Sequence, residues 1–264
     1  MRTTHRFQPL FTLLLIMTMS IPLTVTAALP DTISKVKPAI VGIGIYNKLA
    51  TPRAQLLGTG FAVPVSNQST KSQIIATNDH VVPSRLLNDG KTQFVVFVGQ
   101  GKHPEVRNAR VIARDEKHDL ALLKISGQAI PTLSMTTAQV REGEEYPFTG
   151  FPIGAILGLY PVTHKGMISS ITPVAIPARN AKELTVKQLK HLKNPYMVYQ
   201  LDATAYPGNS GSPVYHPTTG SVIAIVNKVL LKSTKESALT NPSDITYAIP
   251  VKHLQQLIQR TALN

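Results

Sequence analysis

Short apolar runs recur along the whole chain and are separated by residues that favour turns. Their length and their content of Val, Ile and Phe are typical of β-strands. Six runs lie in the first half of the chain: Ala39–Tyr46, Gly60–Val63, Gln73–Thr77, Phe94–Val98, Arg110–Ala113 and Leu120–Ile125. Six more follow: Glu145–Thr149, Gly166–Ile171, Met197–Leu201, Pro213–Tyr215, Ser221–Val226 and Thr246–Ile249. We therefore predict an all-β fold of two six-stranded antiparallel β-barrels, divided in the polar stretch between Gln128 and Val140.

Two segments depart from the strand pattern. Leucine and isoleucine recur at helical spacing over Val251–Leu263, directly after Pro250, which predicts a C-terminal helix that packs on a barrel. Asn180–Lys193 has leucines on one side and lysines on the other. We expect an inserted helix there, either a solvated helix over a barrel edge or a lid beside the functional site that touches anionic surfaces.

The N-terminus has the layout of a secretory signal. Arg2 and Arg6 precede a short apolar stretch from Leu10 to Ile21, and small residues follow. The apolar stretch is shorter than the ~20 residues that a spanning helix needs, which favours a cleaved signal over a membrane anchor. We predict a signal peptide over residues 1–27, cleaved after Ala27 or Ala28, and a bacterial protein exported to the periplasm or secreted. The mature chain then divides into an N-terminal barrel (28–130) and a C-terminal barrel with its helix (131–264), which together form one domain.

Composition limits the partners. The chain has no cysteine, so an exported form is stabilised by its core alone, which suits a bacterial protein better than an animal extracellular one. The net charge of +13 favours weak association with anionic surfaces. Nucleic acid is not expected as a partner, because the basic residues are scattered and no basic motif interleaved with aromatic residues occurs. The histidines lack metal-ligand spacing, so we predict no metal and no cofactor.

Pro207–Pro213 is the first segment that suggests chemistry. Its core, Gly208-Asn209-Ser210-Gly211, places two glycines around a small polar pair. Glycine allows backbone conformations that a side chain blocks, which suits a tight loop that turns the N–H groups of Gly208 and Ser210 toward one point. Such strings also occur in ordinary surface turns, so the loop alone is a weak signal.

A histidine and an aspartate upstream strengthen it. His80 directly follows an apolar predicted strand, and Asp119 directly precedes another. A serine nucleophile needs a general base and a carboxylate that orients this base. Asp79 and Asp115 are the competing acids. The chain order His, Asp, Ser is the chymotrypsin-type order, whereas α/β-hydrolases have Ser, acid, His.

At this point the sequence resembles the protease domain of the HtrA/Deg family over about Pro30 to Ile258. Five segments carry the resemblance: Gly58–Phe61, Thr77–Val82, Asp119–Leu123, Pro207–Pro213 and Tyr247–Pro250. The resemblance implies a two-barrel serine endopeptidase with protein or peptide substrates and with His80, Asp119 and Ser210 as its triad. It also implies an oxyanion hole formed by the amides of Gly208 and Ser210, a loop shaped by Asn209, and a homo-oligomer.

Two departures widen the assignment. Ser212 stands where HtrA-type proteases usually have glycine, and this variant is similar to the glutamyl endopeptidases of the same fold. HtrA chains also normally continue into a PDZ domain, whereas this sequence stops at Asn264. We therefore expect a trypsin-like protease domain without PDZ.

Specificity depends on residues before the nucleophile and on a later strand. In this fold these positions correspond to Thr204, Ala205, Tyr206, Ile225, Val226 and Asn227. None is charged, which predicts a small or medium apolar residue at P1, the substrate position before the cleaved bond. Two alternatives stay open: a non-catalytic protein that binds a peptide or a partner on a protease fold, and an effector protease that acts on one host protein.

Overall fold

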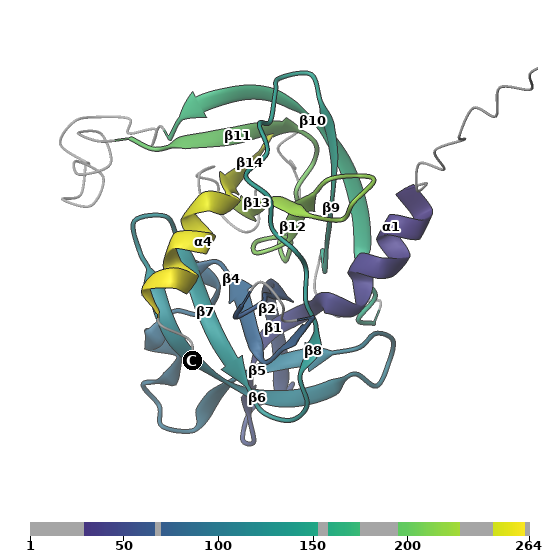
Figure 1. The fold of residues 1–264 in the computed structure, drawn as a ribbon. Coiled ribbons are helices and arrows are strands. Elements are labelled where there is room, and N and C mark those ends of the chain that lie inside the picture. Colours follow the sequence, from purple (N-terminus) through teal and green to yellow (C-terminus); the bar gives the residue numbers. More distant parts are fainter. Residues whose placement is uncertain (1–28, 67–69, 153–157, 175–194, 228–244, 262–264) are drawn as a thin grey trace, which may run out of the picture.

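The computed structural model describes residues 29–66, 70–152, 158–174, 195–227 and 245–261 (Figure 1). The N-terminal barrel closes in the order β1-β2-β4-β7-β6-β5. Its strands are β1 (Ile40–Asn47), β2 (Ala54–Ala62), β4 (Ile74–Thr77), β5 (Thr92–Val98), β6 (Glu105–Asp115) and β7 (Leu120–Ile125).

The C-terminal barrel closes in the order β10-β11-β14-β13-β12-β9. Its strands are β9 (Glu145–Gly150), β10 (Val162–Pro173), β11 (Met197–Asp202), β12 (Pro213–Tyr215), β13 (Val222–Asn227) and β14 (Ile245–Pro250). Each of the twelve predicted runs overlaps one of these strands, so the prediction of two six-stranded barrels is confirmed. A two-stranded sheet of β3 (Lys71–Ser72) and β8 (Ile130–Pro131) lies outside them.

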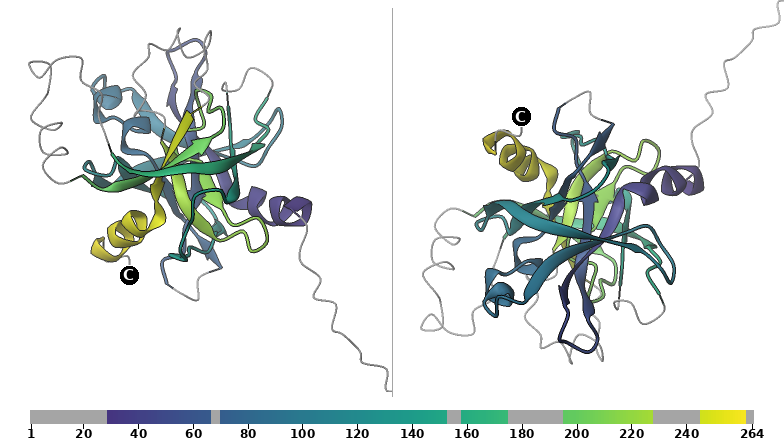
Figure 2. Two further views of the ribbon diagram at one scale, coloured as in Figure 1. Left: turned by 90° about the horizontal axis from the view of Figure 1, so that it is seen from above. Right: turned by 90° about the horizontal axis from the view of Figure 1, so that it is seen from below.

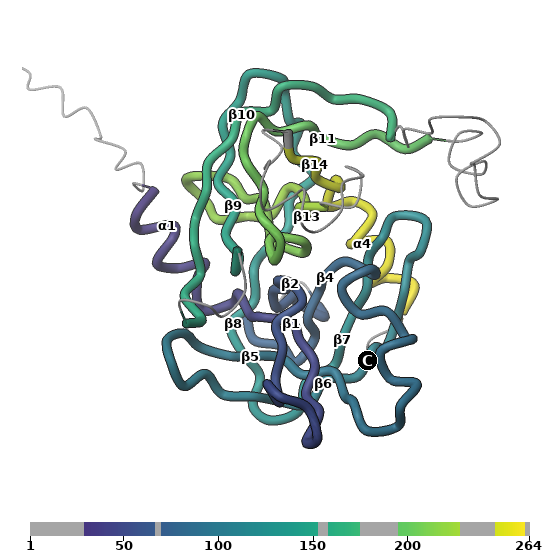
Figure 3. The backbone as a smooth tube through the Cα atoms, turned by 180° about the vertical axis from the view of Figure 1, so that it is seen from behind, coloured from purple at the N-terminus to yellow at the C-terminus, as the bar shows by residue number. Residues whose placement is uncertain are grey.

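The barrels share a core. One buried cluster fills the N-terminal barrel and a second fills the C-terminal barrel. A third cluster joins the two barrels, with Phe61 from β2, Leu122 from β7 and Ile225 from β13. Viewed from behind, the backbone shows the two barrels packed one above the other (Figure 3). Because apolar surface of both barrels is buried in this third cluster, the barrels are held in a fixed relation, as a site built from both requires.

Helices pack on both flanks of the barrels (Figure 2). The sequence did not predict α1 (Leu29–Val36), whose Thr32 hydroxyl donates to the Thr218 carbonyl at 3.1 Å in the C-terminal barrel. On the opposite flank α4 (Val251–Arg260) confirms the predicted C-terminal helix, although it ends at Arg260 rather than at residue 263. Helix α4 contacts β13 and β14 as well as β6 and β7, so it spans both barrels.

Some predictions stay untested. The signal peptide (1–27) and the inserted helix (Asn180–Lys193) lie outside the described residues. The division at residues 130 and 131 falls in the connection between β7 and β9, but α1 packs against the C-terminal barrel, so the division remains a prediction. Within the described ranges, no helix has both the length and the apolar character to cross a membrane.

A polar and aromatic cluster joins α4 to the turn between β6 and β7. His253 on α4 stacks on His118 with a ring-centroid distance of 3.9 Å, and meets the ring of Tyr196 edge-on at 5.3 Å. The Asp115 carboxylate accepts from His118 Nδ1 at 2.8 Å and from Arg260 Nη2 at 2.7 Å. His253 is only 7% exposed, and burial together with the charge on His118 lowers the pKa of His253 to about 4.

This pKa predicts acid sensitivity. Between pH 6.5, the ordinary pKa of histidine, and pH 4, the unfolded chain binds a proton at His253 that the folded chain does not bind. The free energy of unfolding therefore falls as the pH falls through this window, by on the order of 3 kcal/mol in total. His253→Phe keeps a ring in the stack but removes the proton site, so urea unfolding at pH 7, 5.5 and 4.5 should show a weaker pH dependence. His103→Phe, at an exposed turn, is the control. An unchanged pH dependence in His253→Phe would contradict the assignment.

Candidate active site

Thr59 on β2 connects the N-terminal barrel to the loop that contains Ser210. Its backbone N–H donates to the Ser210 carbonyl at 2.9 Å, and its hydroxyl donates to the Gly208 carbonyl at 2.7 Å. The same hydroxyl accepts the backbone N–H of Phe151 at 2.9 Å, and the Thr59 carbonyl accepts the hydroxyl of Thr77 at 2.7 Å. Thr59 is fully buried, so these bonds are shielded from water and fix the loop against β2.

Two loop residues can only be glycine. Gly208 and Gly211 have φ angles of +100° and +88°, in the region where side chains are strained. A Cβ on Gly211 would also lie 2.0 Å from the Thr59 carbonyl oxygen. The loop then returns to the barrel, because Gly211 N–H donates to the Val226 carbonyl at 3.0 Å and Val226 N–H donates to the Ser212 carbonyl at 2.9 Å.

Ser212 fits a space that another glycine leaves open. A Cβ on Gly150 would lie 1.9 Å from the Ser212 hydroxyl and 2.8 Å from the Thr59 hydroxyl. Ser212 is fully buried. The departure from glycine at position 212 is therefore accommodated by the absence of a side chain at position 150, and the loop keeps its course.

His80 and Asp119 form a close pair. His80 lies in a short 3₁₀-helix, η2 (Asp79–Val81), directly after β4, and Asp119 lies directly before β7. His80 Nδ1 is 2.6 Å from Asp119 Oδ2, and the His80 backbone N–H donates to Asp119 Oδ1 at 2.9 Å. A carboxylate only accepts hydrogen bonds, so the pair places the imidazole proton on Nδ1 and leaves Nε2 as the acceptor of a neutral ring.

The backbone of Asp119 is constrained as well. Its φ of +52° is the one left-handed value among the described residues other than glycine. Its carbonyl accepts the backbone N–H of Asp79 at 3.1 Å and the side-chain amide of Asn78 at 3.0 Å. Aspartate tolerates this conformation better than most residues, and these two bonds tie it to the segment that carries His80.

The competing acids have other partners. Asp79 forms an ion pair with Arg114, and Asp115 pairs with His118 and Arg260. Asp79 precedes His80 in the 3₁₀-helix η2, and its carboxylate pairs with Arg114 rather than with the His80 ring. Of the three acids, only Asp119 contacts the His80 side chain in the described structure.

Asn227 contributes a contact that the sequence did not indicate. The Asn227 side-chain amide donates to Asp119 Oδ2 at 2.9 Å, on the oxygen that also meets His80. The predicted place of Asn227 in the substrate pocket stays a prediction; in the structure its side-chain amide lies against Asp119. An asparagine at the end of a buried strand gives no sign of its partner, because the bond from Asn227 at the end of β13 to Asp119 in the other barrel is a tertiary contact.

Gly58 lies between the Ser210 carbonyl and Val81, the residue after His80. A Cβ on Gly58 would lie 2.9 Å from the Val81 methyl groups and 3.1 Å from the Ser210 carbonyl oxygen, so Gly58 separates Ser210 from the residue after His80. Ser210 is 6% exposed. In the described structure no hydrogen bond joins the His80 and Ser210 side chains. Such bonds often tighten only when substrate is bound.

The predicted oxyanion-hole segment is a tight turn. Asn209 N–H donates to the Tyr206 carbonyl at 3.1 Å, and Ser212 N–H donates to the Asn209 carbonyl at 3.0 Å. Asn209 is fully buried, and its side-chain amide has no hydrogen-bond partner among the described residues, so its predicted role in shaping the loop stays a prediction. The backbone N–H groups of Gly208 and Ser210 donate to no described residue.

The predicted pocket residues occupy several environments. Thr204 and Tyr206 are partly exposed, and Ala205 is buried. Ala205 and Val226 belong to the core of the C-terminal barrel, whereas Ile225 belongs to the core between the barrels.

His164 on β10 is a neighbour that the sequence missed. Its ring stacks on Phe148 at a centroid distance of 5.0 Å and lies 6.2 Å from the ring of Tyr206. Burial lowers the pKa of His164, so its ring is neutral at pH 7. His164 lies beside Phe148 because the register of β9 and β10 pairs these two residues.

Several curated proteins are similar to this chain. Serine protease Do-like HtrB of Bacillus subtilis (strain 168) is 26% identical over 257 residues, which cover 92% of this chain and 49% of that protein. Serine protease HTRA1A of Danio rerio is 29% identical over 234 residues, covering 86% of this chain and 40% of that protein. A probable periplasmic serine endoprotease, DegP-like, of Chlamydia pneumoniae is 30% identical over 169 residues, which cover 64% of this chain and 28% of that protein. The chain thus spans half or less of the length of these relatives.

A solved structure supports the fold. A variant of the HtrA-type protease AlgW with a tripeptide matches with a TM-score of 0.60 and 21% identity, over 90% of this chain and 64% of that one. The model of the trypsin-like peptidase domain family matches residues 58–225, which include His80, Asp119 and Ser210. The chain therefore belongs to the trypsin-like peptidase family, and its similar proteins carry the names of HtrA-type serine proteases.

Proposed function

We propose that this protein is a serine endopeptidase that hydrolyses peptide bonds through an acyl-enzyme. The observation that carries the proposal is the His80–Asp119 pair at 2.6 Å, in the barrel whose Thr59 also bonds the loop that contains Ser210. Ser210 is the nucleophile, His80 the general base and Asp119 the residue that orients His80. The amides of Gly208 and Ser210 form the oxyanion hole, and Asn209 shapes the loop.

The reaction follows from this arrangement. The Ser210 hydroxyl attacks the carbonyl carbon while His80 Nε2 accepts its proton. Asp119 stabilises the charged imidazole through the bond to Nδ1, and Asn227 holds the acid on the same oxygen. The negative charge on the carbonyl oxygen is stabilised by the two backbone N–H groups. His80 then gives the proton to the leaving amine, and water hydrolyses the acyl-enzyme by the same route.

A serine-directed fluorophosphonate tests the nucleophile and discriminates an enzyme from a binding protein on the same fold. The probe should label wild-type protein at Ser210 and should not label Ser210→Ala. Ser212→Ala is the matched control: it removes a buried hydroxyl two residues away and should still be labelled. Peptide mapping of the labelled protein gives the modified residue. Folded wild-type protein that resists the probe across several conditions, while still binding peptides, would favour the non-catalytic alternative.

We propose further that the substrate pocket prefers a small or medium apolar P1 residue. The uncharged set Thr204, Ala205, Tyr206, Ile225, Val226 and Asn227 supports this preference. His164, beside Tyr206, is neutral at pH 7 because burial lowers its pKa, so it offers no positive charge to a glutamate side chain. Peptides that differ only at P1 should be cleaved with kcat/KM at least about tenfold higher for Val or Leu than for Glu or Lys. Dominant cleavage after Glu or Lys would overturn the preference.

We also propose that the protein is exported, with residues 1–27 as the signal. The basic start, the apolar stretch and the small residues before Ala28 support export, and one similar protein is named as a probable periplasmic endoprotease. N-terminal sequencing of the protein expressed in a bacterium should give a mature start at residue 28 or 29. An intact Met1 on protein that remains in the cytoplasm would contradict export.

A further inference from the structure

The ladder between β5 and β6 opens along half of its length. These strands pair from Val95–Val98 of β5 to Glu105–Asn108 of β6. Beyond Asn108, the described pairs of β6 are with β7 alone. The start of β5, Thr92–Phe94, has partners on β1 but none on β6. The barrel wall therefore splits between these two segments.

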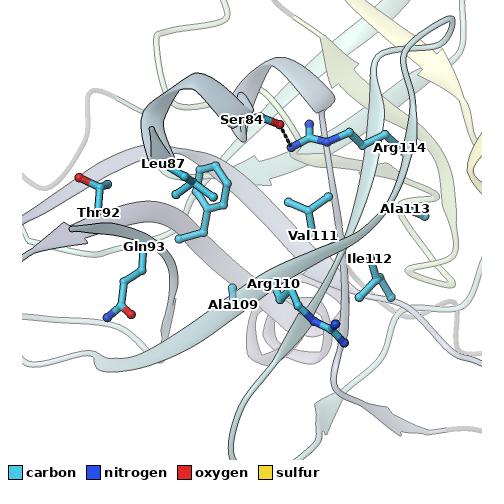
Figure 4. A pocket seen from close by; sticks show the side chains of 11 residues that line it. Ser84, Leu87, Thr92, Gln93, Ala109, Arg110, Val111, Ile112, Ala113 and Arg114 are labelled. Atoms are coloured by element: carbon cyan, nitrogen blue, oxygen red, sulfur yellow. Dashed lines mark hydrogen bonds between the residues drawn. The ribbon is translucent and has the colours of Figure 1, made fainter. Parts of the chain in front are cut away.

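A cavity of about 590 Å³ occupies this split (Figure 4). Six consecutive residues of β6, Ala109–Arg114, line it, and three consecutive residues of β5, Thr92–Phe94, form the opposite side. Successive residues of a strand point to opposite faces, so a cavity lined by an unbroken run of them faces the edge of the strand. Figure 4 shows Val111 and Arg110 on opposite sides of the β6 ribbon, as this geometry requires. We call this cavity the β5–β6 slot.

An exposed strand edge presents backbone N–H and C=O groups that can pair with another extended chain. Peptides that bind in this way gain affinity from main-chain hydrogen bonds and specificity from alternate side chains. Six residues of β6 span about 20 Å at ~3.3 Å per residue, enough for a short peptide strand. The volume of the slot lies within the range of about 300–1,000 Å³ that is usual for ligand sites.

The side chains around the slot indicate which peptide fits. Phe94, Val111 and the 37% exposed Leu87 give it an apolar surface. Arg110 is exposed, and no hydrogen bond or ion pair joins its guanidinium to another described residue, so its charge is available to a ligand. The nearby Asp89 carboxylate accepts from Thr92 and Asn47 and does not neutralise Arg110. Apolar surface beside an unpaired arginine complements an apolar side chain next to a carboxylate.

The slot is connected to His80. Arg114 at its end forms an ion pair with Asp79, the residue before His80, and donates to the Val82 carbonyl at 2.7 Å. Arg114 also donates to the hydroxyl of Ser84 at 3.2 Å, drawn as the dashed line in Figure 4. Ser84 and Leu87 are the ends of η3 (Ser84–Leu87), which follows η2 and lines the slot. A ligand in the slot thus touches the segment that positions His80.

We propose that the β5–β6 slot binds an extended acidic peptide, which adds as a strand to the free edge of β6 and places its carboxylates against Arg110. This site is separate from the Ser210 loop. Its occupation does not depend on the proposed peptidase activity, so the two proposals fail independently.

A binding assay on Ser210→Ala protein, which removes the proposed nucleophile, tests the site. The probe is a fluorescein-labelled peptide of alternating Glu and Val, about nine residues long, and the comparison is the same peptide with Lys in place of Glu. Fluorescence anisotropy should show saturable binding of the Glu peptide, at least about tenfold tighter than that of the Lys peptide. Hydrogen exchange should show protection of the amides of residues 109–114 when the Glu peptide is bound.

Matched variants locate the binding. Arg110→Glu should weaken the Glu peptide at least about tenfold, whereas Lys35→Glu, the same charge reversal on exposed α1, should leave its Kd unchanged within about twofold. Leu87→Asp should weaken binding, and Leu49→Asp, at another exposed leucine, should not. All four positions are accessible at the surface, so the variants are expected to fold. Equal binding of both peptides, protection confined to the Ser210 loop, or no effect of Arg110→Glu would each overturn the proposal.

Discussion

The site depends on one buried threonine. Thr59 has three polar groups: its N–H and its hydroxyl both donate to carbonyls of the loop that contains Ser210, and its C=O accepts from Thr77 on β4. A hydroxyl can donate one hydrogen bond while it accepts another. The Thr59 hydroxyl donates to the Gly208 carbonyl and accepts the backbone N–H of Phe151. Gly58 and Gly60, on either side of Thr59, also allow this close contact between the loop and β2. A side chain at Gly58 would meet Val81 and the Ser210 carbonyl, and one at Gly60 would meet Ile75 and the backbone of Ala76. Gly58-Thr59-Gly60 therefore acts as a unit that lets the loop of one barrel lie directly on a strand of the other.

Asp119 has a left-handed backbone conformation that is stabilised by several hydrogen bonds. Its left-handed backbone costs of order 1–3 kcal/mol if unsupported, although aspartate lies at the low end. The conformation turns the carbonyl toward Asn78 and Asp79 and the carboxylate toward His80 and Asn227. On the other side of the turn, Asp115, His118 and Arg260 connect the same segment to α4. Asp119 is thus held by contacts from both barrels, and its turn is connected to the C-terminal helix through Asp115, as the proposed role of orienting His80 requires.

The strands could be predicted from the sequence, and His80, Asp119 and Ser210 could be singled out as candidates, because both signals are local. A strand buried on one or both faces produces an apolar run wherever it occurs, and His80, Asp119 and Ser210 each lie beside such a run or a glycine turn. The contacts that the sequence missed are tertiary. The partner of Asn227 is on another barrel, the space for the Ser212 hydroxyl is created by Gly150, and α1 is anchored through Thr32 to a turn 186 residues away. No local pattern encodes these pairings, since each depends on how two segments are brought together.

Strand β6 explains why a second site can exist beside the first. Its eleven residues are longer than either neighbour requires: the first half closes the barrel against β5, and the second half pairs with β7 and leads to Asp119. A bulge between Val111 and Ala113 bends the second half. The described pairs of β6 with β5 end at Asn108, before this bulge, so the edge of the second half that faces β5 has no strand partner among the described residues. Arg114, in this second half of β6, lines the slot and also forms an ion pair with Asp79, the residue before His80. The same half of β6 therefore borders the slot and contacts the segment that carries His80, so a ligand in the slot would be linked through Arg114 to the residues on which the proposed chemistry relies.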